Sequence, residues 1–198
     1  MRRPGAQGRD SGRLIAGILL AAGQATRFGR QKLLVPWHGE PLVRRTARCF
    51  LEAGLRPLVA VVSPDARLLE ALAGLPLTTV ENAHPENGIS SSIAIGLRAL
   101  PETTDGAVIG VGDQPYLTAE AIEELVRAFS PGRIVVPRWG DHRGNPPLFD
   151  RRFFAELLAL DGDRGGQRVI AAHPDAVVEV PLPAGLGDDI DRPEDWPG

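Results

Sequence analysis

Two cations at a defined spacing follow a short apolar run near the start of this sequence. Arg27 and Lys32 come after residues 14–22, a run rich in Ile and Leu that is typical of a strand buried on both faces. Open α/β sheets bind ligands in loops that leave the carboxyl ends of such strands, and fixed positive charges suit a polyphosphate. The alternative is a tight strand-to-helix turn with solvated cations.

The loop that carries these cations lacks the common phosphate-binding signatures. It has neither the Gly-Lys-Ser/Thr ending of a Walker A loop nor a Gly-x-Gly-x-x-Gly dinucleotide motif. Ala21 and Ala22 are small enough for the backbone to approach a flat ring, and Gly23 allows its amide to come near a phosphate. The loop therefore predicts a nucleotide or phosphate site of another type.

Two acidic segments provide candidate metal ligands. Asp113 follows the apolar run 107–111, and a carboxylate at the end of a buried strand suits Mg²⁺, which shares its oxygen ligands with substrate phosphates. Asp189 and Asp191 lie near the C-terminus, and we expect Asp191 to reach the same metal. The alternatives are an Asx-turn at Asp113 and a solvated acidic tail around Asp191.

The elements that must position these residues alternate between strand and helix. This alternation predicts an α/β fold with three layers and a mostly parallel, Rossmann-like sheet joined by right-handed crossovers. The expected strands are residues 14–22, 58–62, 77–80, 107–111, 134–137 and 177–181. The expected helices are residues 41–53, 66–74, 93–100, 119–129, 151–160 and 167–172.

The composition indicates one globular domain with a mildly acidic body. The chain has 198 residues, 43% of them hydrophobic, and we expect a disordered tail at 1–12 and a single domain at 13–198. The net charge is −3, although residues 1–13 carry four arginines and one aspartate. This balance does not favour nucleic-acid binding, and the sequence contains no apolar run of the length that crosses a membrane.

Cys49 is the only cysteine, so an intramolecular disulfide is impossible and a reducing cytoplasm is favoured. Its place in a helical apolar pattern predicts a buried thiol. Arg2 and Arg3 before the first apolar run imitate a signal peptide. We favour the cytoplasmic interpretation, because the apolar run already serves as the first strand.

The stretch Leu20-Ala-Ala-Gly-x-x-x-Arg-x-Gly-x-x-Lys32 resembles the opening motif of nucleotidyltransferases, most closely the molybdenum cofactor cytidylyltransferase family. The family often has Ser or Gly where this chain has Ala25. The resemblance covers roughly residues 14–195 and implies that Leu20 to Gly23 contact a nucleotide while Arg27 and Lys32 bind its phosphates.

Further segments resemble the same family. In the segment 82–92, the resemblance implies that Gly88 and Ser92 face the base and ribose, although serines at a helix start are first of all capping residues. Gly112-Asp-Gln-Pro115 resembles the metal-binding motif, and the end 188–195 resembles the family's acidic C-terminal motif. The residues implied on the acceptor side are Gly144, Asn145, Asp163 and Gly165.

The resemblance implies Mg²⁺-dependent transfer of CMP from CTP to molybdopterin molybdenum cofactor, with a molybdoenzyme or its chaperone as a protein partner. The family's guanylyl branch tends to have Leu-Ala-Gly-Gly where this chain has Ala22, so guanylyl transfer is the nearest alternative. A non-catalytic nucleotide- or cofactor-handling module is a further alternative. Glycosyl transfer is less favoured, because Asp-x-Asp occurs here only at Asp189 and Asp191, after the last expected strand.

Overall fold

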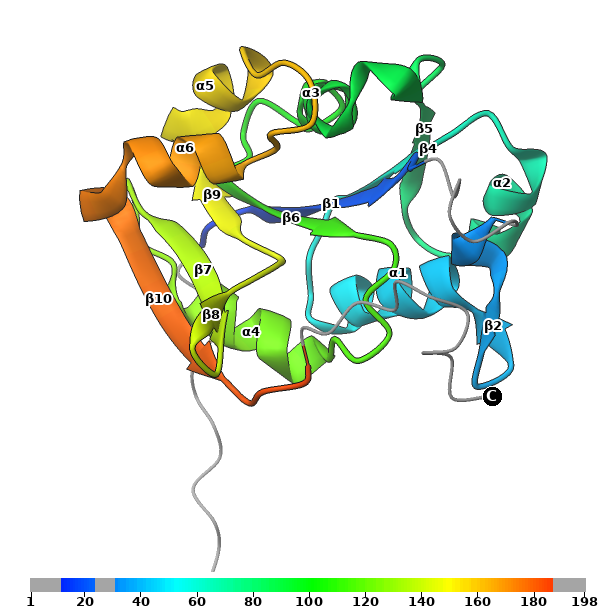
Figure 1. Cartoon of the computed structure of the whole chain (residues 1–198), viewed down its shortest axis with the longest axis horizontal. Coiled ribbons are helices and arrows are strands. Elements are labelled where there is room, and N and C mark those ends of the chain that lie inside the picture. The colour runs from blue at the N-terminus through cyan, green and yellow to red at the C-terminus, as the bar shows by residue number, and fades with distance from the viewer. Residues whose placement is uncertain (1–11, 24–30, 187–198) are drawn as a thin grey trace, which may run out of the picture.

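The computed structural model describes residues 12–23 and 31–186, which form an α/β architecture of three layers (Figure 1). The strands are β1 (Ile15–Ala21), β2 (Pro36–Trp37), β3 (Glu40–Pro41), β4 (Leu58–Val62), β5 (Thr78–Glu81), β6 (Gly106–Val111), β7 (Ile134–Trp139), β8 (His142–Arg143), β9 (Leu148–Asp150) and β10 (Val177–Leu182). The α-helices are α1 (Leu42–Glu52), α2 (Ala66–Leu72), α3 (Ile89–Arg98), α4 (Ala119–Ala128), α5 (Phe154–Leu158) and α6 (Gln167–Ala172). Short 3₁₀ turns are η1 (Lys32–Leu34), η2 (Pro85–Asn87), η3 (Arg151–Phe153) and η4 (Pro174–Ala176).

The central sheet has the strand order β10-β7-β9-β6-β1-β4-β5, with β8 paired to the carboxyl-terminal end of β7. β1 runs parallel to both β4 and β6, and β10 runs parallel to β7. β9 is antiparallel to its two neighbours β6 and β7, and the two-residue strand β8 is antiparallel to β7. The predicted fold, a mostly parallel Rossmann-like sheet between helices, is therefore confirmed.

The residues of β1 alternate between two hydrophobic cores, one on each face of the sheet. Leu19 and Ala21 belong to the core under α1, α2 and α4, whereas Ile18 and Leu20 belong to the core under α3, α5 and α6. Because alternate side chains of a strand point to opposite faces, an entirely apolar strand fits only a sheet covered on both sides. Figure 1 shows these helices above and below the sheet.

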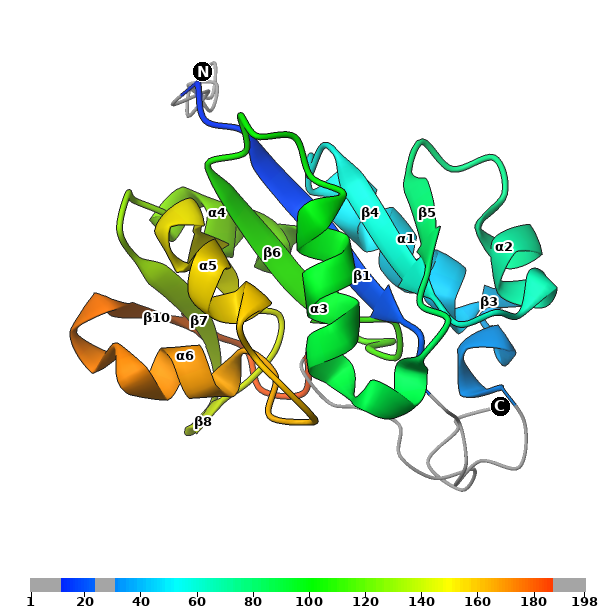
Figure 2. The same cartoon turned by 90° about the horizontal axis from the view of Figure 1, so that it is seen from above.

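Helix α3 packs closely on β1 and β4, near the middle of the sheet (Figure 2). A Cβ atom at Gly96 would lie 2.5 Å from Cγ2 of Ile18, so only a glycine permits this approach. Ile93 and Leu97 bury their side chains in the same core. This close packing places the first turn of α3 beside the carboxyl end of β1.

The antiparallel strand β9 was not expected from the sequence. It has only three residues and follows Pro146 and Pro147, which interrupt the apolar pattern. Leu148 and Phe149 nevertheless alternate between the two cores and are fully buried. Tertiary packing between β6 and β7 therefore makes a strand of a segment whose local sequence gives no strand signal.

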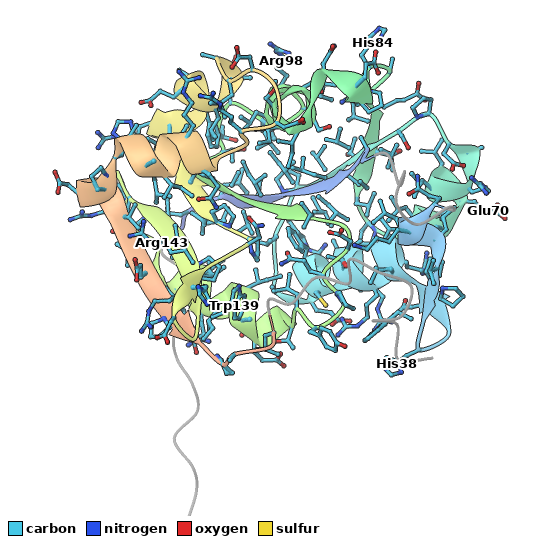
Figure 3. The ribbon with its side chains drawn as sticks, in the orientation of Figure 1. His38, Glu70, His84, Arg98, Trp139 and Arg143 are labelled. Atoms are coloured by element: carbon cyan, nitrogen blue, oxygen red, sulfur yellow. The ribbon has the colours of Figure 1, made fainter. Side chains whose placement is uncertain are left out.

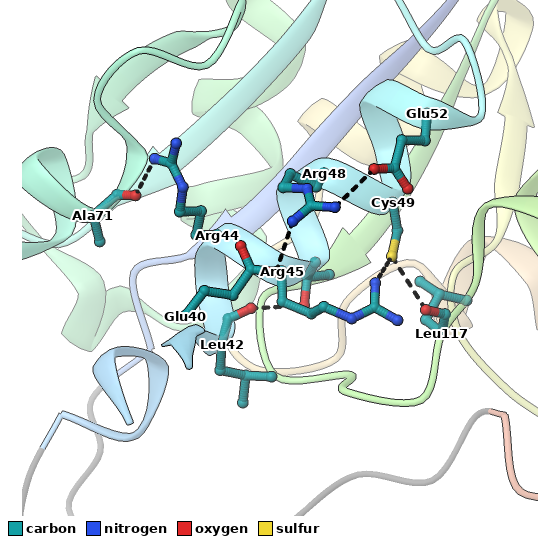
Figure 4. Close-up of polar contacts among 10 residues, drawn as sticks. Glu40, Leu42, Arg44, Arg45, Arg48, Cys49, Glu52, Ala71 and Leu117 are labelled. Carbon is teal, nitrogen blue, oxygen red and sulfur yellow. Dashed lines mark hydrogen bonds and ion pairs between the residues drawn. The ribbon is translucent and has the colours of Figure 1, made fainter. Parts of the chain in front are cut away.

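The arginines of helix α1 form hydrogen bonds and ion pairs with nearby residues (Figure 4). Arg44 donates to the carbonyl oxygens of Ala71 and Ala73 at 2.9 Å, and Arg48 pairs with Glu40 and Glu52. Cys49 is 1% exposed, which confirms the predicted buried thiol.

The buried Cys49 thiol lies between two hydrogen-bond partners. Arg45 donates to its sulfur, and the thiol donates to the carbonyl of Leu117 at 3.2 Å. Burial raises the pKa of the thiol, against the lowering effect of Arg45.

Among the residues with described structure, no helix is long and apolar enough to cross a membrane.

Candidate active site

A cleft of about 480 Å³ opens at the carboxyl ends of β1 and β6. This volume lies within the range of small-molecule sites, and the position is the one at which open α/β sheets bind ligands. Its walls come from five parts of the chain: the end of β1, η1, the junction of η2 with α3, the turn after β6, and the α5–α6 loop. The lining residues are Leu20, Ala22, Gly23, Gln31, Lys32, Leu33, Pro85, Glu86, Gly88, Ile89, Ser92, Val111, Gly112, Asp113 and Asp163.

Lys32 and Asp113 meet inside this cleft. Nζ of Lys32 lies 2.9 Å from Oδ2 of Asp113, and their side chains are 12% and 28% exposed. Lys32 opens η1, and Asp113 follows the last residue of β6 by two positions. Two residues that the sequence indicated for phosphate and metal binding are thus brought together over a separation of 81 residues.

The turn that carries Asp113 is held from two sides. The Gly112 amide donates to the Leu20 carbonyl at 2.9 Å, which continues the pairing of β6 with β1. The buried Thr46 hydroxyl of α1 lies 3.2 Å from the carbonyl oxygens of both Gly112 and Leu42. The sheet and α1 together therefore fix the backbone from which the Asp113 carboxylate projects.

The end of β1 presents Leu20 and Ala22 to the cleft, but not Ala21. Ala22 is 3% exposed and lines the cleft. Ala21 is fully buried in the core on the α1 face. Of the two alanines that the sequence indicated for a flat ring, Ala22 lines the cleft and Ala21 does not, because neighbouring residues of a strand point to opposite faces.

Gly88 joins two segments that are far apart in the sequence. It has φ +87°, and a Cβ atom there would lie 2.5 Å from the carbonyl carbon of Gly162 and 2.6 Å from Oδ1 of Asp163. The amide of Ser90 donates to the carbonyl of Gly162 at 3.2 Å. The α5–α6 loop is therefore packed on the first turn of α3, and this contact brings Asp163 into the cleft.

The helix start differs from the sequence expectation. α3 begins at Ile89, four residues before the expected helix 93–100, and its N-cap is Gly88, without a side-chain capping bond. The serines therefore lie within the first turn instead of capping it. Ser92 is 5% exposed and lines the cleft, which agrees in place with its predicted contact to the nucleotide.

Three of the four predicted acceptor residues lie outside the cleft lining. Gly144 follows the β7–β8 hairpin, from which Trp139 and Arg143 project (Figure 3), and its missing side chain leaves room for the Trp139 ring. The Asn145 carbonyl accepts from Nε1 of Trp139 at 3.2 Å and from Nε2 of Gln114 at 3.3 Å.

Through Gln114, this loop is tied to the turn that carries Asp113. Gly165 is buried, and a Cβ atom there would lie 3.3 Å from Ile89. The contacts to the acceptor predicted for Gly144, Asn145 and Gly165 remain predictions.

Arg27, Asp189 and Asp191 lie outside the described residues, so their predicted roles remain predictions. Within residues 12–23 and 31–186, no group of three His, Cys, Asp or Glu side chains could hold a metal ion. The Asp113 carboxylate, partly exposed in the cleft, is nevertheless a suitable oxygen ligand for a cation whose remaining ligands come from substrate phosphates and water.

Glu86 is a cleft residue that the sequence did not single out. Its own backbone amide and a hydrogen bond from His84, 3.0 Å away, lower the pKa of its carboxyl group. Glu86 is therefore ionised at neutral pH. Its position in the predicted segment 82–92 was the available signal, but a glutamate in a polar loop is more often only solvated.

Comparison with known proteins gives a consistent family. Residues 17–177 match the model described as a MobA-like NTP transferase domain. Nicotine blue oxidoreductase of Paenarthrobacter nicotinovorans is 29% identical, over 91% of this chain and 93% of that protein. The purine catabolism protein PucB of Bacillus subtilis is 29% identical over 92% and 94%. A probable molybdenum cofactor guanylyltransferase of Opitutus terrae is 30% identical over 80% and 78%.

Solved structures agree with this match. Rv0371c of Mycobacterium tuberculosis H37Rv has a TM-score of 0.83 and 25% identity, with 93% of this chain and 96% of that chain covered. A complex of Rv0371c with manganese has a TM-score of 0.75 and 26% identity, with 92% and 96% covered. The fold thus recurs in a protein whose structure has also been solved as a complex with manganese.

Proposed function

Because the chain belongs to the MobA-like NTP transferase domain family, we propose that this nucleotidyltransferase transfers CMP from CTP to the phosphate of molybdopterin molybdenum cofactor. The observation that carries the proposal is the Lys32–Asp113 pair, 2.9 Å apart in a cleft at the carboxyl ends of β1 and β6. A cation and a carboxylate at this place suit the triphosphate and its metal.

In the proposed reaction, an oxygen of the acceptor phosphate attacks the α-phosphorus of CTP. The bond from that phosphorus to the bridging oxygen of the β-phosphate breaks, and pyrophosphate leaves with the bonding electrons. A phosphate monoester is largely ionised at neutral pH, because its second pKa is about 6. The reaction therefore needs charge neutralisation and alignment more than a general base.

The residues of the cleft have distinct proposed roles. Lys32 holds the triphosphate and offsets the charge that gathers on the leaving pyrophosphate. Asp113 would hold Mg²⁺, and a bound divalent ion would neutralise phosphate charge and orient the reacting groups. Arg27 and Asp191 are proposed to assist them from outside the described residues. The Rv0371c complex with manganese supports a divalent metal.

The proposed base and the proposed acceptor are supported by different observations. Ala22 lines the cleft, and its methyl group reduces the room for a purine, which favours CTP. The relative named as a probable molybdenum cofactor guanylyltransferase supports the acceptor class and keeps GTP as the alternative nucleotide. A methyl group supports only about 1–3 kcal/mol of discrimination, so the preference for CTP is expected to be moderate.

A second candidate function follows from the relative named nicotine blue oxidoreductase. A hydride-transferring enzyme would oxidise NADH or NADPH and release no pyrophosphate. A module that only binds nucleotides would do neither. These products separate the three functions.

The test is a panel of the four NTPs with purified molybdopterin molybdenum cofactor and Mg²⁺ or Mn²⁺, read by pyrophosphate release. A parallel assay follows NADH and NADPH absorbance. We expect pyrophosphate release with CTP above GTP, dependence on the metal, and none without acceptor. If none of the four NTPs gives pyrophosphate release and NADH or NADPH is oxidised, the second candidate replaces the proposal.

A further inference from the structure

Asn82 is a buried polar residue at the end of β5 that has no place in the proposed chemistry. It is 2% exposed. Its backbone amide donates to the carbonyl of Val62 at 2.8 Å, which extends the pairing of β5 with β4 beyond the strand. Its side chain is therefore held at a fixed point of the sheet edge, facing the first turn of α3.

The side-chain amide of Asn82 uses all of its strong hydrogen-bonding groups except one lone pair. Nδ2 donates to the hydroxyl of Ser91 at 2.8 Å and to the hydroxyl of Ser92 at 2.9 Å. Oδ1 accepts from the backbone amide of His84 at 3.0 Å. The His84 amide can only donate, so it fixes which end of the Asn82 amide faces the serines.

This orientation makes both serine hydroxyls acceptors toward Asn82, and each hydroxyl keeps one proton to donate. Ser91 donates its proton to the carbonyl of Gly88 at 2.8 Å. Ser92 donates to none of the described residues, although it is 95% buried and lines the cleft. Its proton is therefore available to a ligand in the cleft.

We infer that Asn82 is a positioning residue that fixes the Ser92 hydroxyl as a hydrogen-bond donor to the bound nucleotide. The inference rests on the proposed function, and it adds the polarity of this contact. Ser92 would serve an acceptor atom of the nucleotide, such as a carbonyl oxygen of the base or a ribose oxygen. A hydroxyl held by Asn82 in this way disfavours a ligand that presents an N–H at the same point.

Asn82→Asp tests the polarity, because it keeps the shape of the side chain and the acceptor for His84 but removes both donors. A carboxylate at this position would accept the proton of Ser92 and leave an oxygen lone pair facing the ligand. We expect the dissociation constant for CTP with Mg²⁺, measured by calorimetry without acceptor, to rise about three- to tenfold, which is the usual weight of one neutral hydrogen bond. The kcat at saturating CTP should change less than twofold.

Ser92→Ala distinguishes this mechanism from a general effect of the added charge. Combined with Ser92→Ala, Asn82→Asp should weaken CTP binding no further, because it acts through that hydroxyl. A loss that persists in the double variant would overturn the inference. So would an Asn82→Asp protein that binds CTP like the wild type.

Ser91→Ala is the matched control, since Ser91 shares the bond to Asn82 but does not line the cleft. It should lower the melting temperature without changing CTP binding. If Asn82→Asp does not fold, Asn82→Ala takes its place in the same cycle with Ser92→Ala, with the same expected absence of a further loss. A wild type that binds no NTP would overturn the proposed function itself, whereas wild-type binding with unaltered variants would overturn only the role of Asn82.

Discussion

The two sides of the cleft are built from different kinds of contact. The strand-end wall, formed by Ala22, Lys32 and Asp113, carries an ion pair on a backbone held by sheet and helix hydrogen bonds. The helix wall, formed by Gly88, Ile89 and Ser92, is shaped by neutral hydrogen bonds and by a close backbone contact. The ion pair on the strand-end wall suits reaction at phosphate, and the neutral Ser92 hydroxyl on the helix wall suits selection among nucleotides. Glu86 and Asp163 add carboxylates beside the helix wall.

The largest expected effect lies on the strand-end wall. Asp113→Asn should lower kcat/KM for CTP about a thousandfold, or roughly 4 kcal/mol, because the metal loses a charged ligand. The melting temperature should change little, since the side chain is partly exposed. The exposed Asp141 provides the control variant Asp141→Asn, which should be fully active. Near-normal activity of Asp113→Asn at saturating Mg²⁺ would show that Asp113 is not the metal ligand.

On the helix wall, Gly88→Ala should cost about 1–3 kcal/mol of unfolding free energy, which urea titration measures. The added methyl group would collide with the backbone of Gly162 and would sit at a positive φ. Gly162→Ala is the matched control, because Gly162 also has a positive φ, +62°, but a Cβ atom there meets no atom of the described residues within 4 Å. Equal losses in the two variants would mean that backbone strain, and not the loop contact, limits this position.

Thr46→Val tests how the strand-end wall is held. Losing the hydroxyl leaves the Gly112 carbonyl without that donor and should cost about 1 kcal/mol of unfolding free energy, with a rise in KM for CTP. Thr104 is 1% exposed, and its hydroxyl has no hydrogen-bond partner among the described residues. Thr104→Val should therefore be neutral or stabilising. A Thr46→Val protein that behaves like Thr104→Val would show that the turn does not depend on α1.

The smallest expected effect concerns nucleotide choice. Ala22→Gly should raise the ratio of kcat/KM for GTP to that for CTP about three- to tenfold, because a methyl group leaves the cleft. Ala21→Gly removes a methyl group from the opposite face of β1 and should lower stability without changing this ratio. An unchanged ratio in Ala22→Gly would place base selection entirely on the helix wall.

The sequence predicted the strand-end wall better than the helix wall, for a physical reason. Asp113 and Lys32 follow buried apolar strands, and parallel strands bring their carboxyl ends to one edge, so local pattern and topology suffice to place them. The contact of Gly88 with Gly162 and the bond from Thr46 to Gly112, 66 residues apart, depend on how helices and loops pack onto the sheet. No local pattern encodes such distances.

The hydrogen bonds of Asn82 and the strand β9 were not predicted for the same reason. Asn82 follows the strand β5 in a polar segment, and its partners become apparent only when α3 is in place. β9 is a strand because β6 and β7 lie on either side of it. The sequence of β9 does not itself favour a strand, and its pairing with β6 and β7 determines its conformation, which is common for short strands.

The hydrogen bond from Ser90 to Gly162 joins the α5–α6 loop to the first turn of α3, and so links the segment proposed for the acceptor to the one proposed for the nucleotide. A ligand that holds the α5–α6 loop in place would also hold the first turn of α3. The second ligand would then lose less conformational entropy when it binds. By thermodynamic reciprocity, the acceptor and the nucleotide would then raise each other's affinity by the same factor. Calorimetric titration of each substrate in the presence and absence of the other measures that factor directly.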